Sequence, residues 1–263
     1  MIKVLGFCRV SFYYHHQLDE QDECLKEQIL KVLRANPAYG HRRIALALGI
    51  NRKRARRVMR KYGIKPYKRM ARRRKRSDLG RKSAPFANLV KNNQPVKPNL
   101  VYVSDFTCLR FQGRNLYLST FMDLFTREVV GWSISVRHTK ELVLNAFLDA
   151  LKNNGFQIPK VIHSDQGAEY NCKQYVKFLT YLGIQISMSK KKSPWENSYQ
   201  ESFYANFKTD LGLEFDRFNS LGELIEAVHQ TINYYNKARI HTSLKMPPEE
   251  YKRLYDQKVV EFS

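Results

Sequence analysis

Residues 100–111, LVYVSDFTCLRF, combine apolar and β-branched side chains and predict a long strand. The segment QGR at 112–114 is typical of a hairpin turn, and two further strands are expected at 115–125 and 127–136. Beyond them the pattern predicts alternating helices and strands, at 139–153, 160–165, 171–182, 184–189, 195–211 and 220–236, with a short helix from Pro248. This order indicates an α/β fold, in which a mixed sheet has helices on its faces.

Length and composition exclude several classes of protein. The 263 residues suffice for one core of about 150 residues and a smaller module. No apolar run approaches the roughly 18 residues of a membrane span, and Arg9 interrupts the segment in which a signal peptide would need an apolar run. The four cysteines have no CxxC spacing, which argues against a disulfide framework or a zinc ribbon.

Positive charge is concentrated in the first third of the chain. The whole sequence has 46 basic and 24 acidic residues, a net charge of +22. Residues 1–98 hold 26 basic and 6 acidic side chains, a net +20, whereas residues 99–263 hold 20 and 18, a net +2. A solvated face normally mixes both signs, so a polyanionic partner is the better interpretation. The charge alone leaves DNA, RNA and an anionic membrane open.

A helical module is predicted ahead of the sheet. Helices are expected at 19–36, 41–48 and 52–62, with Gly49 ending the second helix and Asn51 capping the third. The third helix, RKRARRVMRKY, is the most basic of them. A glycine-bearing turn before a basic last helix is typical of a helix-turn-helix module, which favours nucleic acid as the partner. The alternative is a plain amphipathic bundle.

Composition also predicts the boundaries of the parts. Residues 65–98 are basic at first and then carry Gly80, Pro85, Pro95 and Pro98, which is typical of an extended linker. The predicted organisation is a helical DNA-binding module, the linker, a sheet-containing core and a C-terminal tail with a short helix, at residues 1–64, 65–98, 99–236 and 237–263.

Three carboxylates form the candidate site. Asp105 lies on an apolar face of the first strand, where an unpaired carboxylate is costly. Asp165 ends a strand within HSDQG, and Glu201 lies on a helix whose aromatic face can pack on the sheet. Carboxylates brought together repel one another, and cations that prefer oxygen ligands, such as Mg²⁺ or Mn²⁺, relieve this repulsion. Asp123 is a rival for Asp105 because it also lies in a predicted strand.

The sequence around these acids resembles a known family. Asp105 precedes Asp165 by 60 residues, and 35 residues separate Asp165 from Glu201. The blocks that contain them resemble DDE transposases of bacterial insertion sequences, and they read YVSDFT, HSDQGAEY and SPWENSYQESFYANFK. The resemblance is to the second-reading-frame (OrfB) product of the frameshifting two-frame family, and it extends over nearly the whole chain through CRVSFYYHH, PAYGHRRIALAL and YYNKARIHTSLKMPPEEY. These transposases are similar to retroviral integrases, so the resemblance implies a ribonuclease-H-like fold.

The resemblance also implies the chemistry. Asp105, Asp165 and Glu201 would be the catalytic residues and the ligands of two Mg²⁺ or Mn²⁺ ions. The implied enzyme is a DDE-type polynucleotidyl transferase: water attacks a phosphodiester at the end of the element and frees a 3′-OH, which then attacks another phosphodiester. Two other functions stay open, a non-catalytic DNA-binding regulator of transposition and a ribonuclease-H-like nuclease.

DNA contacts are expected from two regions. Asn197 and Lys208 match a polar and a basic position of the family, with capping or a solvated helix surface as the alternatives. His163 and His241 also match family positions, but a structural role is expected for both, and Trp195 is expected to pack in the core. The basic residues hypothesised to hold terminal DNA are Arg42, Arg43, Arg52, Lys53, Arg56, Arg57, Arg60, Arg72, Arg73 and Arg74.

The expected partner is double-stranded DNA, namely the terminal inverted repeats of the element and its target. The resemblance implies a homo-oligomer of at least two chains and an upstream (OrfA-like) product as a further partner. A bacterial cytoplasmic, nucleoid-associated location is expected, without a membrane partner. His15, His16 and Cys24 do not form the zinc-binding arrangement of retroviral integrases, so no structural zinc is expected.

Overall fold

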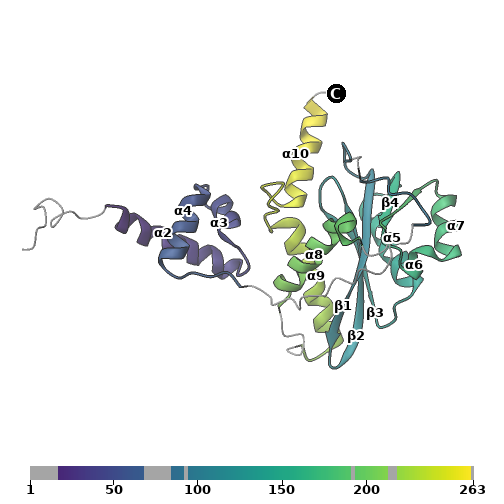
Figure 1. The fold of residues 1–263 in the computed structure, drawn as a ribbon, viewed down its shortest axis with the longest axis horizontal. Helices are drawn as coiled ribbons and strands as arrows, with labels where there is room; N and C mark the ends of the chain where they lie inside the picture. The colour runs from purple at the N-terminus through teal and green to yellow at the C-terminus, as the bar shows by residue number, and fades with distance from the viewer. Residues whose placement is uncertain (1–16, 68–83, 92–93, 191–192, 213–217, 262–263) are drawn as a thin grey trace, which may run out of the picture. The chain divides into compact units, whose positions relative to one another are not determined.

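A computed structural model gives the fold of residues 17–67, 84–91, 94–190, 193–212 and 218–261. The chain divides into two compact units, residues 1–68 and 69–263. The described part of the first unit is helical, and the second contains the sheet (Figure 1). No helix in these described ranges combines the length and the apolar character that a membrane span needs.

The first unit contains the three predicted helices, α2 (Gln17–Ala35), α3 (His41–Ala47) and α4 (Arg52–Lys61). Their apolar sides meet in a small core that includes Leu25, Ile29, Ile44, Ala55 and Val58. Gly49 ends the second helix with φ +62°, a backbone conformation that glycine adopts without steric cost. The side chain of Asn51 accepts a hydrogen bond from the α4 backbone at 2.7 Å, as the predicted N-cap requires.

The second unit contains a five-stranded mixed sheet with the order β3-β2-β1-β4-β5. The strands are β1 (Val101–Phe111), β2 (Arg114–Asp123), β3 (Val129–Ser135), β4 (Val161–Ser164) and β5 (Gln185–Met188). Strands β1 and β3 each run antiparallel to β2, whereas β4 runs parallel to β1 and β5 parallel to β4. Gln112 and Gly113 form the turn between β1 and β2, and both have positive φ, as in the tight turns that suit twisted strands.

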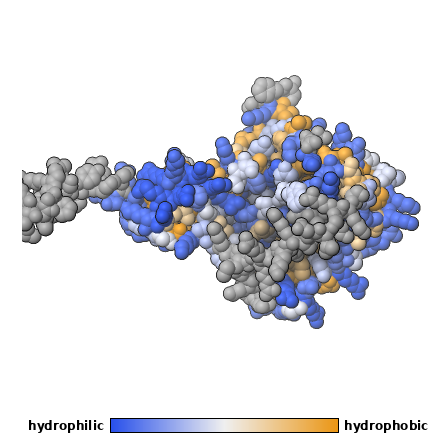
Figure 2. Space-filling view, in the orientation of Figure 1, coloured by the Kyte–Doolittle hydropathy of each residue, from blue (hydrophilic) through white to orange (hydrophobic). Residues whose placement is uncertain are grey.

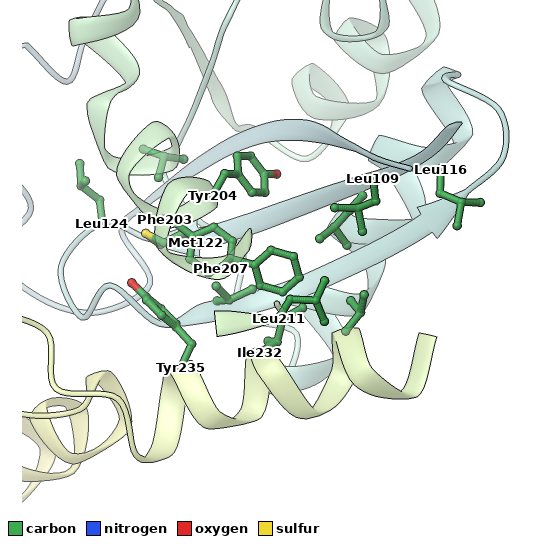
Figure 3. Close-up of a cluster of buried hydrophobic side chains, with 14 of the residues drawn as sticks. Leu109, Leu116, Met122, Leu124, Phe203, Tyr204, Phe207, Leu211, Ile232 and Tyr235 are labelled. Atoms are coloured by element: carbon green, nitrogen blue, oxygen red, sulfur yellow. The ribbon is translucent and has the colours of Figure 1, made fainter. Parts of the chain in front are cut away.

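Helices cover both faces of this sheet (Figure 1). One face carries α5 (Lys140–Asn153), α6 (Ala168–Asn171) and α7 (Lys173–Tyr181), whose apolar side chains share a core with Tyr102 and Phe121 of the strands. The opposite face carries the 3₁₀ turn η1 (Pro194–Asn197), α8 (Ser198–Asp210) and α9 (Leu221–Lys237). Figure 3 shows how side chains of α8 and α9 meet those of the strands in this second core. The sheet is therefore buried on both faces, as in other α/β folds.

The close packing of α5 on β3 depends on Gly131. A Cβ atom at this position would lie 2.3 Å from the backbone nitrogen of Ala150 and 2.5 Å from the carbonyl oxygen of Ala146. No other residue type leaves room for the helix backbone to approach the strand so closely.

The predicted linker at 65–98 is too long at its C-terminal end. Val90 is buried in the core beneath α8 and α9, and Phe86 packs against the core on the opposite face. The backbone nitrogen of Leu89 also donates to Ser187 Oγ at 2.8 Å. Residues 84–91 therefore belong to the core, because their apolar side chains bury against the sheet despite the prolines around them.

A helix begins at Pro248, as predicted, but it is longer than the short helix expected in a C-terminal tail. The helix α10 (Pro248–Glu261) has 14 residues and packs on the core. The rings of Tyr251 and Tyr255 lie 5.5 and 5.1 Å from that of Phe125, measured between centroids. Lys252 Nζ also pairs with the half-buried Glu128 at 3.2 Å. These aromatic contacts lengthen the ordered helix beyond what its own weak apolar pattern predicts.

Candidate active site

The parallel pairing of β1 with β4 brings the two candidate aspartates together. The register pairs Val103 with His163. Two residues further along each chain lie Asp105, within β1, and Asp165, directly after the end of β4. The carboxyl ends of parallel strands are the usual place for a ligand site in sheets of this kind.

The carboxyl group of Asp105 is half-buried beside two other acids. Its Oδ1 accepts a hydrogen bond from the backbone nitrogen of Phe106 at 2.8 Å, which lowers its pKa. Burial and, after it, the negative charges of Asp165 and Glu201 outweigh this bond and raise the pKa of Asp105 to about 7. The three carboxylates are therefore close enough to act on one another electrostatically.

Asp165 is held at the start of a turn in which Gly167 lies close to two carboxylates. Its Oδ1 accepts a hydrogen bond from Gly167 N at 2.9 Å. A Cβ atom on Gly167 would lie 3.1 Å from this oxygen and 2.9 Å from Oε2 of Glu169, so glycine makes room for both carboxylates. Glu169 in turn pairs with Nδ1 of His138 at 3.0 Å. Burial raises the pKa of Asp165, and the charge of Glu169 adds to this effect.

The third acid, Glu201, is exposed on the first turn of α8. Phe203 and Phe207 are buried and hold the helix on the sheet, as the aromatic pattern predicts. Gln200 and Tyr204 lie on the same buried side and donate hydrogen bonds to backbone oxygens of β1. The helix is thus joined to the strand that carries the first aspartate.

The rival carboxylate, Asp123, has a structural role. It is buried at the end of β2, where Oδ1 accepts hydrogen bonds from Thr126 N at 2.7 Å and from Phe125 N at 2.9 Å. Oδ2 accepts a third from Asn99 N at 2.6 Å. Because its lone pairs are used to close the turn into β3, Asp123 is not a candidate ligand.

The two polar candidates of the α8 region both contact β1. Asn197 is buried, and its Nδ2 donates to the carbonyl oxygen of Ser104 at 3.4 Å, while no described residue hydrogen-bonds to its Oδ1. Lys208 Nζ donates to the carbonyl oxygen of Cys108 at 2.8 Å. Both side chains therefore lie along the strand that carries Asp105.

The remaining family positions differ in their surroundings. His163 is buried, its Nδ1 lies 2.8 Å from Ser187 Oγ, and burial lowers its pKa to about 4, which suits the structural role expected for it. His241 pairs through its backbone with Met246. The expected core packing of Trp195 is wrong, since 57% of its surface is exposed.

The basic candidates of the first unit fall into two groups. Arg57 is bound to Asp22 of α2, with Nη1 2.6 Å from Oδ2, so it ties α4 to α2. Arg43 is half-buried, with its guanidinium 5.8 Å from the centre of the Tyr39 ring. The exposed group is Arg42, Arg52, Lys53, Arg56 and Arg60, on a unit whose visible surface is mostly hydrophilic (Figure 2). The candidates outside the described residues are Arg72, Arg73 and Arg74.

The donor set suits a divalent cation. Asp105, Asp165 and Glu201 supply carboxylate oxygens, the ligands that Mg²⁺ and Mn²⁺ prefer. Burial and then the charges of the other two acids raise the pKa of Asp105, and a cation would offset this negative charge. Within the described ranges, no three side chains of His, Cys, Asp or Glu are close enough to enclose a metal ion. The carboxylates thus approach one another without closing on a common centre.

Comparison with known proteins identifies the family. Two models of the integrase core domain match residues 95–194 and 182–248. The transposase for insertion sequence element IS904 of Lactococcus lactis is 36% identical over 56% of this chain and 58% of its own length. The InsK protein assigned to insertion sequence element IS150 of Escherichia coli (strain K12) is 34% identical over 96% of this chain and 92% of its own length. The chain belongs to the DDE transposases of insertion sequences.

Solved structures confirm the fold predicted for this transposase. The catalytic core of the HTLV-2 integrase, in complex with magnesium, superposes with a TM-score of 0.51 at 20% identity and covers 60% of this chain and 98% of its own. The intasome of simian T-cell lymphotropic virus gives a TM-score of 0.55 at 17% identity, over 85% of this chain and 74% of its own. The second unit is therefore ribonuclease-H-like. The transposase is a polynucleotidyl transferase, and the regulator and nuclease alternatives are not favoured.

Four residues that lie beside the acids or on the helix of Glu201 were not predicted from the sequence. Gln200 and Tyr204 looked like ordinary members of an aromatic helix, and Glu169 and His138 are distant in sequence from each other. The sequence held one signal for these neighbours, Gly167, because a glycine directly after HSDQ indicates that other groups approach the backbone closely beside Asp165.

Proposed function

We propose that this transposase cleaves DNA at the ends of its insertion sequence and joins the freed 3′-OH to target DNA, with Asp105, Asp165 and Glu201 as the catalytic centre. The observation that supports this most directly is that the pairing of β1 with β4 brings Asp105 near Asp165, and that the charges of Asp165 and Glu201 add to burial in raising the pKa of Asp105 to about 7. We infer that the carboxylates hold two Mg²⁺ or Mn²⁺ ions.

The reaction consists of two displacements at phosphorus. In the first, water attacks a phosphodiester at the element end, the P–O3′ bond breaks, and the strand leaves as a 3′-OH. In the second, this 3′-OH attacks a target phosphodiester and the target's own 3′-oxygen leaves, so the number of phosphodiester bonds is conserved. Bound divalent ions would stabilise the charge that develops on the attacking and leaving oxygens. The chain's own contribution is to hold the carboxylates and the DNA in place.

DNA is held, in this proposal, by both units. The exposed basic residues of the first unit contact phosphates, and their charge excess favours a polyanion. Asn197 and Lys208 lie along β1 and contact the DNA end near the acids. Bringing two ends together requires at least a dimer, with an upstream (OrfA-like) product as a further partner. A cytoplasmic, nucleoid-associated location follows from a DNA substrate in bacteria.

A cleavage and joining assay tests the proposal. A labelled duplex of the element end is incubated with Mn²⁺ and the wild-type protein, Asp165→Asn or Glu201→Gln. We expect cleavage and joining by the wild type and at least a 100-fold loss in both variants. Glu250→Gln serves as the matched control, because Glu250 is exposed on α10.

The possible results separate the functions. Binding of the duplex without chemistry would favour a regulator, and cleavage without joining would favour a nuclease. Unchanged joining by Asp165→Asn would show that the catalytic centre lies elsewhere.

A further inference from the structure

A buried polar network joins α8 to β1 at Asp105 and two residues before it. Nε2 of Gln200 donates to the carbonyl oxygen of Val103 at 2.7 Å. The hydroxyl of Tyr204 donates to the carbonyl oxygen of Asp105 itself at 2.5 Å. The helix that carries Glu201 is thus hydrogen-bonded to the backbone two residues before the first aspartate and at that aspartate.

Thr120 completes the network from the neighbouring strand. It lies directly opposite Asp105 in the pairing of β1 with β2. Its Oγ1 donates to Oε1 of Gln200 at 3.2 Å and lies 2.9 Å from the hydroxyl of Tyr204. One hydroxyl therefore connects both helix side chains to the strand pair that carries the catalytic aspartate.

Packing alone does not account for these polar side chains. Gln200 and Thr120 are fully buried and Tyr204 is 6% exposed. Burial of polar groups costs free energy unless each is hydrogen-bonded, and leucine or valine at these positions would avoid this cost. Phe203 and Phe207 already supply apolar contacts with the sheet, as Figure 3 shows. Apolar contacts tolerate small shifts of a helix, whereas hydrogen bonds to particular carbonyl oxygens do not.

We propose that Gln200, Thr120 and Tyr204 are positioning residues that set the place of Glu201 relative to Asp105, and so the separation of the carboxylates that bind the divalent ions. The inference rests on the function proposed for these acids. Groups that orient metal ligands typically change metal affinity or activity 10- to 100-fold when they are removed. None of the three touches the reacting atoms in this scheme.

The decisive variant is Tyr204→Phe, which deletes one hydroxyl and keeps the ring in the core. Tyr175→Phe is the matched control, since Tyr175 is equally buried and its hydroxyl has no hydrogen-bond partner among the described residues. Two quantities are measured in each protein: the rise in Tm caused by Mn²⁺, and the rate of end cleavage well below Tm as a function of Mn²⁺ concentration.

Tyr204→Phe is expected to need about ten times more Mn²⁺ for the same rise in Tm and to cleave 10- to 100-fold more slowly. Tyr175→Phe is expected to match the wild type in both. Lower Tm in Tyr204→Phe, with an unchanged Mn²⁺ response and an unchanged rate at low temperature, would show that the hydroxyl only stabilises the fold and would overturn the proposal.

A second pair of variants, at Thr120, shows whether a lost Mn²⁺ response is due to misfolding. Thr120→Val removes the hydroxyl at nearly constant volume, whereas Thr120→Ser keeps it. We expect the Mn²⁺ response to fall in the valine variant and to recover in the serine variant. Equal responses in both would contradict the positioning role.

The rise in Tm caused by Mn²⁺ tests this inference separately from the proposed function. A wild-type protein that binds Mn²⁺ but cleaves no DNA would refute the proposed function, and the Mn²⁺ response of Tyr204→Phe would still decide the inference. Wild-type cleavage that Tyr204→Phe reproduces in full would refute the inference alone. Absence of any Mn²⁺ response in the wild type would overturn both.

Discussion

Replacement of Asp105 by asparagine is expected to stabilise the metal-free protein. The pKa of Asp105 rises from its usual 3.8 to about 7, chiefly because of burial and then because of the charge of Asp165. Each pKa unit corresponds to about 1.4 kcal/mol, so the ionised carboxylate costs about 4 kcal/mol relative to the unfolded chain. Asparagine removes the charge, and its side-chain oxygen can still accept the hydrogen bond from Phe106 N.

The stability cost of the ionised Asp105 carboxylate depends on pH in a defined direction. Between pH 3.8 and about 7 the folded protein holds a proton at Asp105 that the unfolded chain has lost. The free energy of unfolding therefore falls as the pH rises through this range, and the contribution of the protonated carboxyl is lost above about pH 7. The advantage of Asp105→Asn over the wild type should grow from about 2 kcal/mol at pH 5 to about 4 kcal/mol at pH 8.

Urea unfolding with EDTA, at pH 5 and at pH 8, measures this difference. Tryptophan fluorescence reports on the correct unit, because Trp132 and Trp195 are the two tryptophans of the chain and both belong to the second unit, which contains Asp105. Mn²⁺ at pH 8 should stabilise the wild type more than the variant, since only the wild type retains all three carboxylates.

Asp123→Asn is the control for a general effect of amide substitution. It places an NH₂ group on the side chain whose Oδ2 accepts from Asn99 N, so we expect a loss of about 1–3 kcal/mol where Asp105→Asn gains stability. A stability difference between Asp105→Asn and the wild type that does not change with pH would refute the reasoning, because it would show that Asp105 is ionised at little cost.

Three further predictions follow from single features of the fold. Gly131→Ala should destabilise the core by about 3 kcal/mol or more, because its Cβ would overlap the backbone of Ala150, and an unchanged urea midpoint would contradict this packing. Arg239→Ala should cost about 3–5 kcal/mol in urea unfolding, because it leaves the buried Asp210 without its cation, and a loss below about 1 kcal/mol would contradict the buried pair. DNA affinity should fall with salt at a log–log slope near −5 if about six phosphates are neutralised, and Arg56→Gln should reduce the slope by about 1; a flat salt dependence would argue against the basic surface.

The sheet and its helices could be predicted because their signals are local. Apolar and β-branched residues mark the strands, and the QGR turn marks the hairpin between β1 and β2. The structure of residues 84–91 could not be predicted in this way, because their composition resembles that of a linker. Only contacts with distant parts of the sheet order them. The length of α10 was missed for the same reason, since its aromatic partner Phe125 lies far away in the sequence.

The sequence by itself determined the class of the fold and the basic character of the first unit, and it predicted the three acids, because spacing, charge and flanking residues are properties of the chain. The flanking residues already favoured Asp105 over Asp123, and the tertiary structure supplies a physical reason: Asp105 lies near other carboxylates, whereas the oxygens of Asp123 accept the hydrogen bonds of a turn. It also decided that Gln200 and Tyr204 face β1. A polar side chain on an aromatic helix is buried only where a distant strand offers it hydrogen-bond partners, and no local pattern records that partner.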